Sequence, residues 1–213
     1  MATSDEMAHE ELIQDRKRHL RHITRVQRRA LTAEVRRAAS AALVARLETL
    51  DVVRDARGIG LYAPFDGEID PLALLDAPMC VGKVIGWPHI GGAARAMTFR
   101  EAPSATEPGH PGYSAAVRDG MARGELGIGT PTGATLSAAV LDVLIVPGVL
   151  FTHSGARLGM GAGYYDRFLT GFQGTTLGVG YDWQRVDALP TEPHDRLLSY
   201  VVTPSEVVRC GAG

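Results

Sequence analysis

The 213-residue sequence has few cysteines, few lysines and no long apolar run. Two cysteines, Cys80 and Cys210, are too few for a disulfide framework and are not spaced as a metal-binding pair. No segment approaches the roughly 20 consecutive apolar residues that span a bilayer. Residues 1–15 are acidic and polar, which differs from the basic-then-apolar layout of a signal peptide. These absences predict a cytoplasmic protein with no membrane partner.

Charge of either sign is not in large excess, because 22 basic residues face 24 acidic ones and the formal net charge is -2. No overall field therefore favours nucleic acid as a partner. The basic residues are unevenly placed, however, and crowd into one early segment: Arg16, Lys17, Arg18, Arg21, Arg25, Arg28, Arg29, Arg36 and Arg37. A solvated basic helix face is the simplest interpretation of this segment. Lysine occurs only at Lys17 and Lys83, so a compact ammonium at Lys17 suggests a specific role.

Hydrophobic residues make up 45% of the chain and charged residues 22%, which is typical of a globular protein. At this length we expect a flexible N-terminal tail, residues 1–10, and a single domain over residues 11–213. Apolar periodicity predicts a helix from about Glu11 to Leu31 and a second one that begins after an N-cap at Thr32.

Short apolar runs alternate with helical segments along the rest of the chain. Helices are expected to begin at Asp70 and Tyr164, and residues 101–137 are expected to be mostly loop. Strands are expected near residues 58–62, 81–86, 96–100, 141–146, 176–181 and 200–203. This alternation predicts an α/β domain with a largely parallel sheet and helices on both faces. Ligands in such sheets bind beyond the carboxyl ends of the strands, which directs attention to the loops after Tyr62, Val146 and Tyr181.

The most informative stretch is Arg157 to Asp166, in which Gly159, Gly161 and Gly163 alternate with larger residues. Alternating glycines let backbone N–H groups approach an anion, and the following helix adds its positive N-terminus. The stretch matches neither a Walker loop nor the dinucleotide fingerprint. It is therefore either a structural turn or a phosphate loop, and the neighbouring Arg157 favours the latter.

Three acidic residues are candidates for ligand contacts. Asp166 follows the glycine stretch, where a carboxylate either complements the helix dipole or shares a Mg²⁺ ion with phosphate. A second acid for Mg²⁺ could come from Asp195. Glu68 follows the strand that ends near Tyr62 and is either a surface acid or an acceptor for the N–H groups of a ligand.

Taken together and in order, these segments resemble the 5-formyltetrahydrofolate cyclo-ligase family. The resemblance runs from about Lys17 to Val207. It rests on segments 17–21, 62–68, 142–148, 157–166, 177–184 and 189–195, of which the stretch Arg157-Leu158-Gly159-x-Gly161-x-Gly163-Tyr164-Tyr165-Asp166 is the most specific. It implies a Rossmann-like three-layer α/β sandwich that converts 5-formyltetrahydrofolate and ATP to 5,10-methenyltetrahydrofolate, ADP and phosphate.

The resemblance also implies roles for individual residues. Those assigned to catalysis are Lys17, Arg157 and Tyr164. Those assigned to ATP are Lys17, Arg18, Arg21, Arg157, Leu158, Gly159, Met160, Gly161, Ala162, Gly163, Tyr164 and Tyr165. Those assigned to the folate are Arg21, Tyr62, Ala63, Glu68, Gly161 and Tyr164. Asp166 and Asp195 would hold Mg²⁺.

The implied partners are ATP and 5-formyltetrahydrofolate, with or without a polyglutamate tail. The protein is expected to be a monomer or a weak homo-oligomer. The sequence departs from the family at Thr130, which stands where an acid is usual, so that folate contact is in doubt. Two other functions remain as alternatives. One is a sugar-phosphate isomerase or CoA-transferase relative on a similar fold, and the other is a nucleic-acid-binding module that uses the arginine-rich helix.

Overall fold

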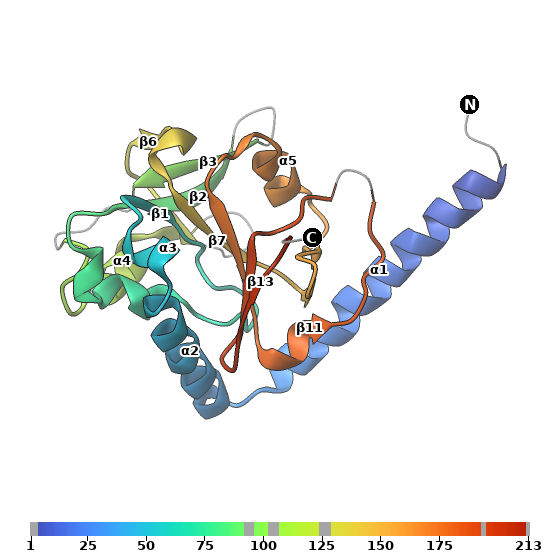
Figure 1. Cartoon of the computed structure of the whole chain (residues 1–213), viewed down its shortest axis with the longest axis horizontal. Coiled ribbons are helices and arrows are strands. Elements are labelled where there is room, and N and C mark those ends of the chain that lie inside the picture. Colours follow the sequence, from blue (N-terminus) through green and yellow to red (C-terminus); the bar gives the residue numbers. More distant parts are fainter. Residues whose placement is uncertain (1–3, 92–95, 102–106, 124–128, 193–194, 212–213) are drawn as a thin grey trace.

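The structure is a computed structural model that describes residues 4–91, 96–101, 107–123, 129–192 and 195–211 (Figure 1). Its centre is an eight-stranded sheet. The strand order is β13 (Val207–Arg209), β12 (Tyr200–Val202), β10 (Thr175–Val179), β7 (Val143–Pro147), β1 (Gly58–Gly60), β2 (Val84–Gly91), β3 (Ala96–Glu101) and β6 (Thr135–Leu136). The five strands from β12 to β2 are parallel, and β13, β3 and β6 pair antiparallel at the edges.

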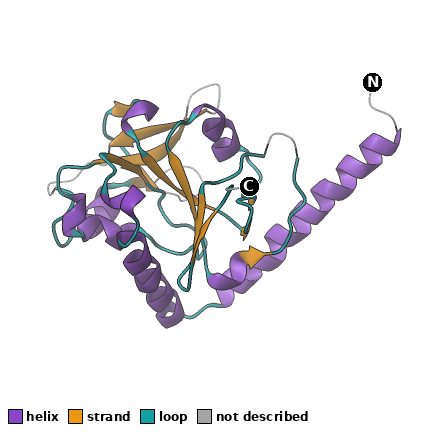
Figure 2. Cartoon of the chain, viewed as in Figure 1, coloured by secondary structure: helices purple, strands orange, loops and turns teal. Residues whose placement is uncertain are grey.

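Helices and short sheets surround this sheet (Figure 2). The α-helices are α1 (Ser4–Ala30), α2 (Ala33–Glu48), α3 (Asp51–Arg54), α4 (Tyr113–Gly120) and α5 (Tyr164–Gly171). The 3-10 helices are η1 (Leu72–Asp76), η2 (Pro78–Cys80), η4 (Ala138–Val140) and η5 (Asp182–Gln184). The short strands are β8 (Leu150–Thr152), β9 (Arg157–Leu158) and β11 (Arg185–Val186) in one sheet, and β4 (Ala122–Arg123) and β5 (Gly129–Thr130) in another.

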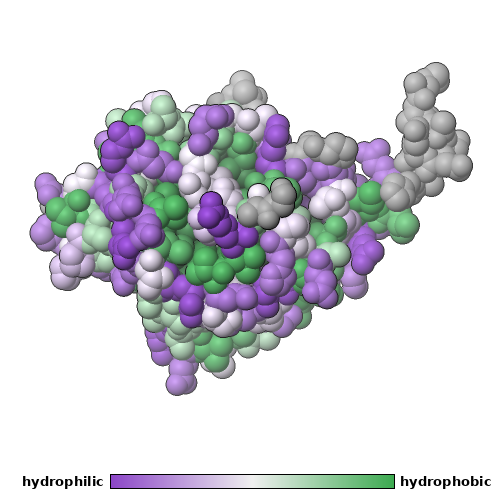
Figure 3. All heavy atoms as spheres, in the orientation of Figure 1, coloured by the Kyte–Doolittle hydropathy of each residue, from purple (hydrophilic) through white to green (hydrophobic). Residues whose placement is uncertain are grey.

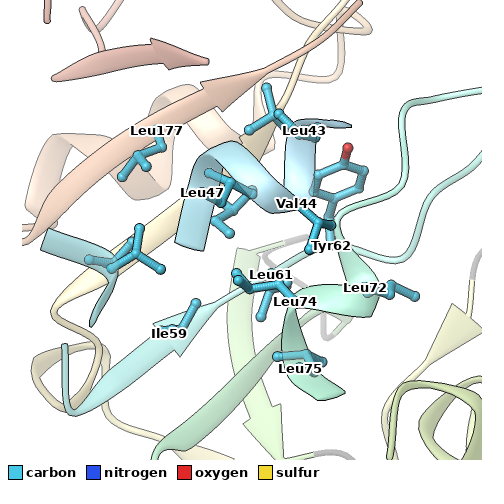
Figure 4. Packing of buried hydrophobic residues seen from close by; sticks show 14 of the residues in the cluster. Leu43, Val44, Leu47, Ile59, Leu61, Tyr62, Leu72, Leu74, Leu75 and Leu177 are labelled. Atoms are coloured by element: carbon cyan, nitrogen blue, oxygen red, sulfur yellow. The ribbon is translucent and has the colours of Figure 1, made fainter. Parts of the chain in front are cut away.

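Side-chain alternation on β7 creates the two apolar layers. Val143 and Ile145 point to the face covered by α2 and η1, whereas Leu144 and Val146 point to the face covered by α5. Figure 4 shows the first layer, in which Leu43 and Leu47 of α2 pack over the central strands. Because both faces of the parallel strands are covered, the expected three-layer α/β fold is confirmed.

The strands that follow β1 and β7 in this sheet lie on opposite sides of the β1–β7 pair. β1 is followed by its neighbour β2, whereas β7 is followed by β10 and β12 on the opposite side. A parallel sheet has its ligand crevice at such a switch point, beyond the carboxyl ends of the two strands. The segments that leave this point are residues 61–70 after β1 and residues 148–163 after β7.

Helix α1 is longer than the sequence predicted, and one end projects beyond the sheet (Figure 1). It begins at Ser4 rather than near Glu11, so residues 4–10 are helical. The predicted cap of α2 is confirmed, because the Thr32 hydroxyl accepts a hydrogen bond from the Val35 N–H. In Figure 3 hydrophilic and hydrophobic residues intermingle on the face in view. No helix among the described residues is long and apolar enough to cross a membrane.

Other expectations about secondary structure need correction. In place of the helix expected to begin at Asp70, the structure has two 3-10 helices, η1 and η2. Pro78 lacks an N–H group, so it cannot continue the hydrogen bonding of a helix from η1. The described residues of the stretch 101–137, which was expected to be mostly loop, include α4 and the three short strands β4, β5 and β6. The short strands β8, β9 and β13 were not predicted, because runs of two or three residues carry too little periodicity.

Candidate functional site

The glycine loop, residues 159–163, leaves β9 and ends at the first residue of α5. Gly161 has φ +103° and Gly163 has φ +67°, so both occupy backbone conformations that side chains disfavour. Gly163 is the N-cap of α5 and has no side chain to cap the first N–H groups of that helix. Positive-φ glycines before an uncapped helix start are typical of anion-binding turns.

Arg157 lies beneath this loop and is only 8% exposed. It donates to the Pro147 carbonyl at 3.2 Å, pairs with Asp166 at 2.6 Å, and lies 5.5 Å from the centre of the Tyr165 ring. A Cβ at Gly159 would come within 2.6 Å of Arg157 Nη1, so a side chain there would displace the guanidinium. Arg157 therefore braces the loop and orients Asp166, and its side chain is more enclosed than the sequence suggested.

Helix α1 packs against the glycine loop at Leu20 and Arg21. Leu20 joins a small apolar cluster that includes Leu158, and Arg21 Nε donates to the Gly159 carbonyl at 2.8 Å. Partial burial lowers the pKa of Arg21, and the nearby carboxylates of Asp166, Asp195 and Glu192 oppose that shift. Arg21 is thus a cation surrounded by three acids at the mouth of the loop.

Lys17 lies one helical turn before Arg21 and is 5% exposed. Its ammonium donates to Glu192 at 2.6 Å and to Asp195 at 3.1 Å. Gln14 donates to both carboxylate oxygens of Glu192, and Asp195 also accepts from the Glu192 N–H at 2.8 Å. A buried ammonium is stable only with such partners, so this cluster fixes Lys17 between Glu192 and Asp195, one turn of α1 before Arg21.

Glu68 belongs to the second segment at the switch point. The turn before it is sharp, because Asp66 has φ +52° and Gly67 has φ +77°. Glu68 accepts a hydrogen bond from the Phe65 N–H at 3.1 Å and lies 3.6 Å from the guanidinium of Arg28. Burial raises the pKa of Glu68 to about 7, although Arg28 works against the shift.

Three tyrosines surround Glu68. The Tyr62 hydroxyl donates to the Ile69 carbonyl, and the Tyr181 hydroxyl donates to the Gly67 carbonyl at 3.1 Å. The Tyr165 hydroxyl is buried and finds no hydrogen-bond partner among the described residues. Burial raises the pKa of both Tyr62 and Tyr165, with the Glu68 carboxylate adding to the shift. Tyr165 thus connects the glycine loop to the surroundings of Glu68.

The remaining predicted site residues lie at varying distances from this centre. Tyr164 packs toward the second core layer with Arg167 over its ring, and Met160 is 43% exposed on the loop. Ala63 lies beside β5, where a Cβ on Gly129 would contact it at 3.6 Å, and Ala162 is exposed. Arg18 is exposed and pairs with Asp15 on its own helix, so the structure does not bring it to the loop.

An open cavity of about 490 Å³ adjoins the Glu68 segment. Its wall includes Pro64, Gly67 and Glu68 on one side, and Arg36 and Arg37 from α2 on another. Thr130, the expected departure from the family, lies on β5 and pairs with Ala122 of β4. Residues 127–128, which belong to the same departure, lie outside the described residues.

The site includes residues that sequence reasoning missed. Glu192, Asp66 and Tyr181 were not singled out, and Arg28 was seen only as part of a basic helix. The Asp66-Gly67 pair carried a turn signal, and Glu192 precedes Asp195 by three positions. Neither signal shows which distant cation each acid meets.

The fold and the position of this site define a class, the α/β proteins whose candidate site lies beyond the carboxyl ends of a parallel sheet. The model of the 5-formyltetrahydrofolate cyclo-ligase family matches residues 13–204, and the chain belongs to that family. The Escherichia coli K12 5-formyltetrahydrofolate cyclo-ligase is 34% identical over 86% of this chain and 97% of its own length. The Mycolicibacterium smegmatis relative of the same name is 30% identical over 88% and 93%.

Comparison of structures agrees with this assignment. The solved structure of Aquifex aeolicus 5,10-methenyltetrahydrofolate synthetase is 29% identical, with a TM-score of 0.74 over 92% of this chain and 94% of its own. A Mycoplasma pneumoniae 5,10-methenyltetrahydrofolate synthetase matches with a TM-score of 0.66 at 20% identity, which shows the shared fold.

Proposed function

We propose that this protein catalyses the ATP-dependent closure of 5-formyltetrahydrofolate to 5,10-methenyltetrahydrofolate, with release of ADP and phosphate. The observation that carries the proposal is the meeting of two segments with α1 at the switch point. Arg21 of α1 contacts the glycine loop, Lys17 one turn earlier contacts Glu192, and the same helix reaches Glu68 through Arg28. Family membership indicates the substrates. We assign ATP to the glycine loop and the folate to the Glu68 segment.

The reaction needs an activated formyl group, because an amide oxygen is a poor leaving group. The formyl oxygen attacks the γ-phosphorus, and ADP departs with the electron pair of the broken P–O bond. N10 of the folate then attacks the activated carbon, loses its proton, and phosphate leaves. The nucleophiles belong to the substrates, so alignment and charge stabilisation are the tasks of the protein.

The described residues are suited to these tasks. Arg21 and the backbone N–H groups of the glycine loop would bind the phosphates, and Lys17 would stabilise charge on the transferred group. The Glu68 carboxylate would accept N–H groups of the pterin ring. Tyr164 and Arg157 were assigned to catalysis on resemblance; for Arg157 the contacts support a positioning role through Asp166.

Mg²⁺ fits this arrangement as a partner of ATP. Asp166 and Asp195 both lie near Arg21, and carboxylates are ligands that Mg²⁺ prefers. The described residues contain no cluster of three or more metal-ligating side chains. That is compatible with Mg²⁺, which binds one or two carboxylates and takes its other ligands from phosphate and water. When bound, the ion would neutralise phosphate charge.

The test is the near-ultraviolet absorbance of 5,10-methenyltetrahydrofolate, followed with purified protein with and without ATP and Mg²⁺. We expect product only when 5-formyltetrahydrofolate, ATP and Mg²⁺ are all present. Absence of product with a folded protein would refute the proposal. Sugar-phosphate isomerisation or CoA transfer in its place would favour the alternative reactions on this fold. The same assay with 5-formyltetrahydrofolate that carries or lacks a polyglutamate tail tests whether the enzyme prefers the polyglutamate form. We also propose a cytoplasmic location for this reaction.

A further inference from the structure

Arg28 is a fully buried arginine on α1, with 0% of its surface exposed. None of its three guanidinium nitrogens makes a hydrogen bond to any described residue. Two carboxylates lie at ion-pair distance, Asp66 at 3.8 Å and Glu68 at 3.6 Å. A buried guanidinium without hydrogen bonds is costly, so its position requires an explanation beyond helix packing.

The two carboxylates near Arg28 are not equivalent. Asp66 already accepts from Arg25 at 2.7 Å and from Arg29 at 2.5 Å, so two closer cations neutralise it. Glu68 has no other cation within ion-pair distance among the described residues. The charge of Arg28 therefore acts chiefly on Glu68.

We propose that Arg28 is a positioning residue that keeps the Glu68 carboxylate ionised and directed at the substrate. The inference rests on the proposed function, in which Glu68 accepts N–H groups of the pterin ring. A heterocycle of the 2-amino-4-oxo type offers adjacent N–H donors, and only the ionised carboxylate can accept two of them. Arg28 thus sets the lower limit of the pH range in which the folate substrate binds.

The surroundings of Glu68 make this role necessary. Burial raises its pKa to about 7, so near neutrality the carboxylate is on the point of taking up a proton. Asp66 adds to the rise, and Arg28 together with the Phe65 N–H opposes it. The other titratable or charged groups around Glu68 or its adjoining cavity are Tyr62, Tyr165, Tyr181, Asp70, Arg36, Arg37 and Arg118. The tyrosines are neutral in this range, and Arg118 is paired with Asp70.

The experiment compares Arg28→Met with Arg28→Lys and with Arg29→Met as a matched control. Arg29 lies next to Arg28 and also pairs with Asp66, but no ion pair joins it to Glu68. Two quantities are measured from about pH 5.5 to about pH 9: the titration of the Glu68 carboxyl by NMR without ligand, and the Kd for 5-formyltetrahydrofolate without ATP.

In the wild type we expect Kd to rise as pH falls through the Glu68 titration, by up to tenfold per pH unit. In Arg28→Met both the titration and the rise in Kd should move upward by about one pH unit, while the KM for ATP and the kcat at alkaline pH stay within about threefold. Arg28→Lys should restore most of the shift, and Arg29→Met, which reaches Glu68 only through Asp66, should move the profile much less than Arg28→Met does.

An unchanged Glu68 titration in Arg28→Met, with only a lower melting temperature, would overturn the inference and assign Arg28 a structural role. Should Arg28→Met not fold, Glu68→Gln gives the decision, because it must abolish the pH dependence of Kd in this range. Retention of that dependence in Glu68→Gln also overturns the inference. Failure of the proposed function has a different signature: the wild type would bind or titrate as expected without forming product.

Discussion

The Lys17 ammonium lies 2.6 Å from the Glu192 carboxylate, although 175 positions separate the two residues in the sequence. The contact joins α1 to the loop between β11 and β12. It also gives a physical reason for a lysine at position 17 in an otherwise arginine-rich segment. A compact ammonium can be enclosed by two carboxylates, whereas the wider guanidinium needs a planar site.

Lys17→Met should lower the turnover of the cyclisation at least tenfold, because in the proposed function Lys17 stabilises charge on the transferred phosphoryl group. The structure adds that Glu192 and Asp195 would lose their shared buried partner, so unfolding should become easier by about 1–3 kcal/mol. Initial rates and thermal melts of the purified variant check both effects. Arg16→Met, a change at an exposed arginine of the same helix, is the control. Wild-type turnover in Lys17→Met would remove it from the site.

Glu68→Gln should weaken binding of the folate far more than binding of ATP, because only the first segment at the switch point is altered. The measurement is the Kd of each ligand determined separately. Equal losses for both ligands would contradict the division of the site between Glu68 and the glycine loop.

The same substitution should change stability in a pH-dependent way. The pKa of Glu68 is raised in the folded state to about 7, so the folded protein binds the proton more tightly than the unfolded chain. The wild type therefore loses stability as pH rises from about 4.5 to about 7, and the cost persists above that range. Glu68→Gln lacks this cost, so its melting temperature should exceed that of the wild type at pH 8 and approach it at pH 5. A constant difference across this range would show that Glu68 is not the titrating group.

Gly161→Ala should reduce activity through both strain and contact. The backbone at Gly161 has φ +103°, and a Cβ there would lie 3.3 Å from Arg21 Cζ. We expect a stability loss of about 1–3 kcal/mol and a raised KM for ATP that excess Mg²⁺ does not correct. Gly171→Ala is a matched control, because nothing lies within 4 Å of a Cβ at that position. An unchanged KM for ATP would show that the loop does not approach the phosphates.

Asp166→Asn should behave differently from the glycine variant, because it removes a charge and preserves shape. We expect a reduced rate that is partly restored as the Mg²⁺ concentration increases. Asp142→Asn, which changes an aspartate paired with Arg57 at the opposite end of β7, should leave the Mg²⁺ dependence unchanged. Normal activity and normal Mg²⁺ dependence in Asp166→Asn would make this residue only a brace for Arg157.

The parts of the fold that sequence alone could predict are those with strong local signals. The apolar run of β7 and the Thr32 cap of α2 depend on neighbouring residues, and the structure confirms both. The sequence did not predict α4, which has eight residues and lies between glycine- and proline-rich segments. A helix this short carries little apolar periodicity. The site shows the same contrast. The glycine loop has a local signature, whereas the burial of Lys17 and Arg28 depends on partners far along the chain.

The contacts of α1 also have a consequence for synthesis. This helix is synthesised before its partners, because Gly159, Glu192 and Asp195, which engage Arg21 and Lys17, are made 138 to 178 residues later. A growing chain therefore carries Lys17 and Arg21 before Glu192 and Asp195 have been made. The part of α1 around these two cations cannot dock natively until those acids have emerged, so its contacts form late.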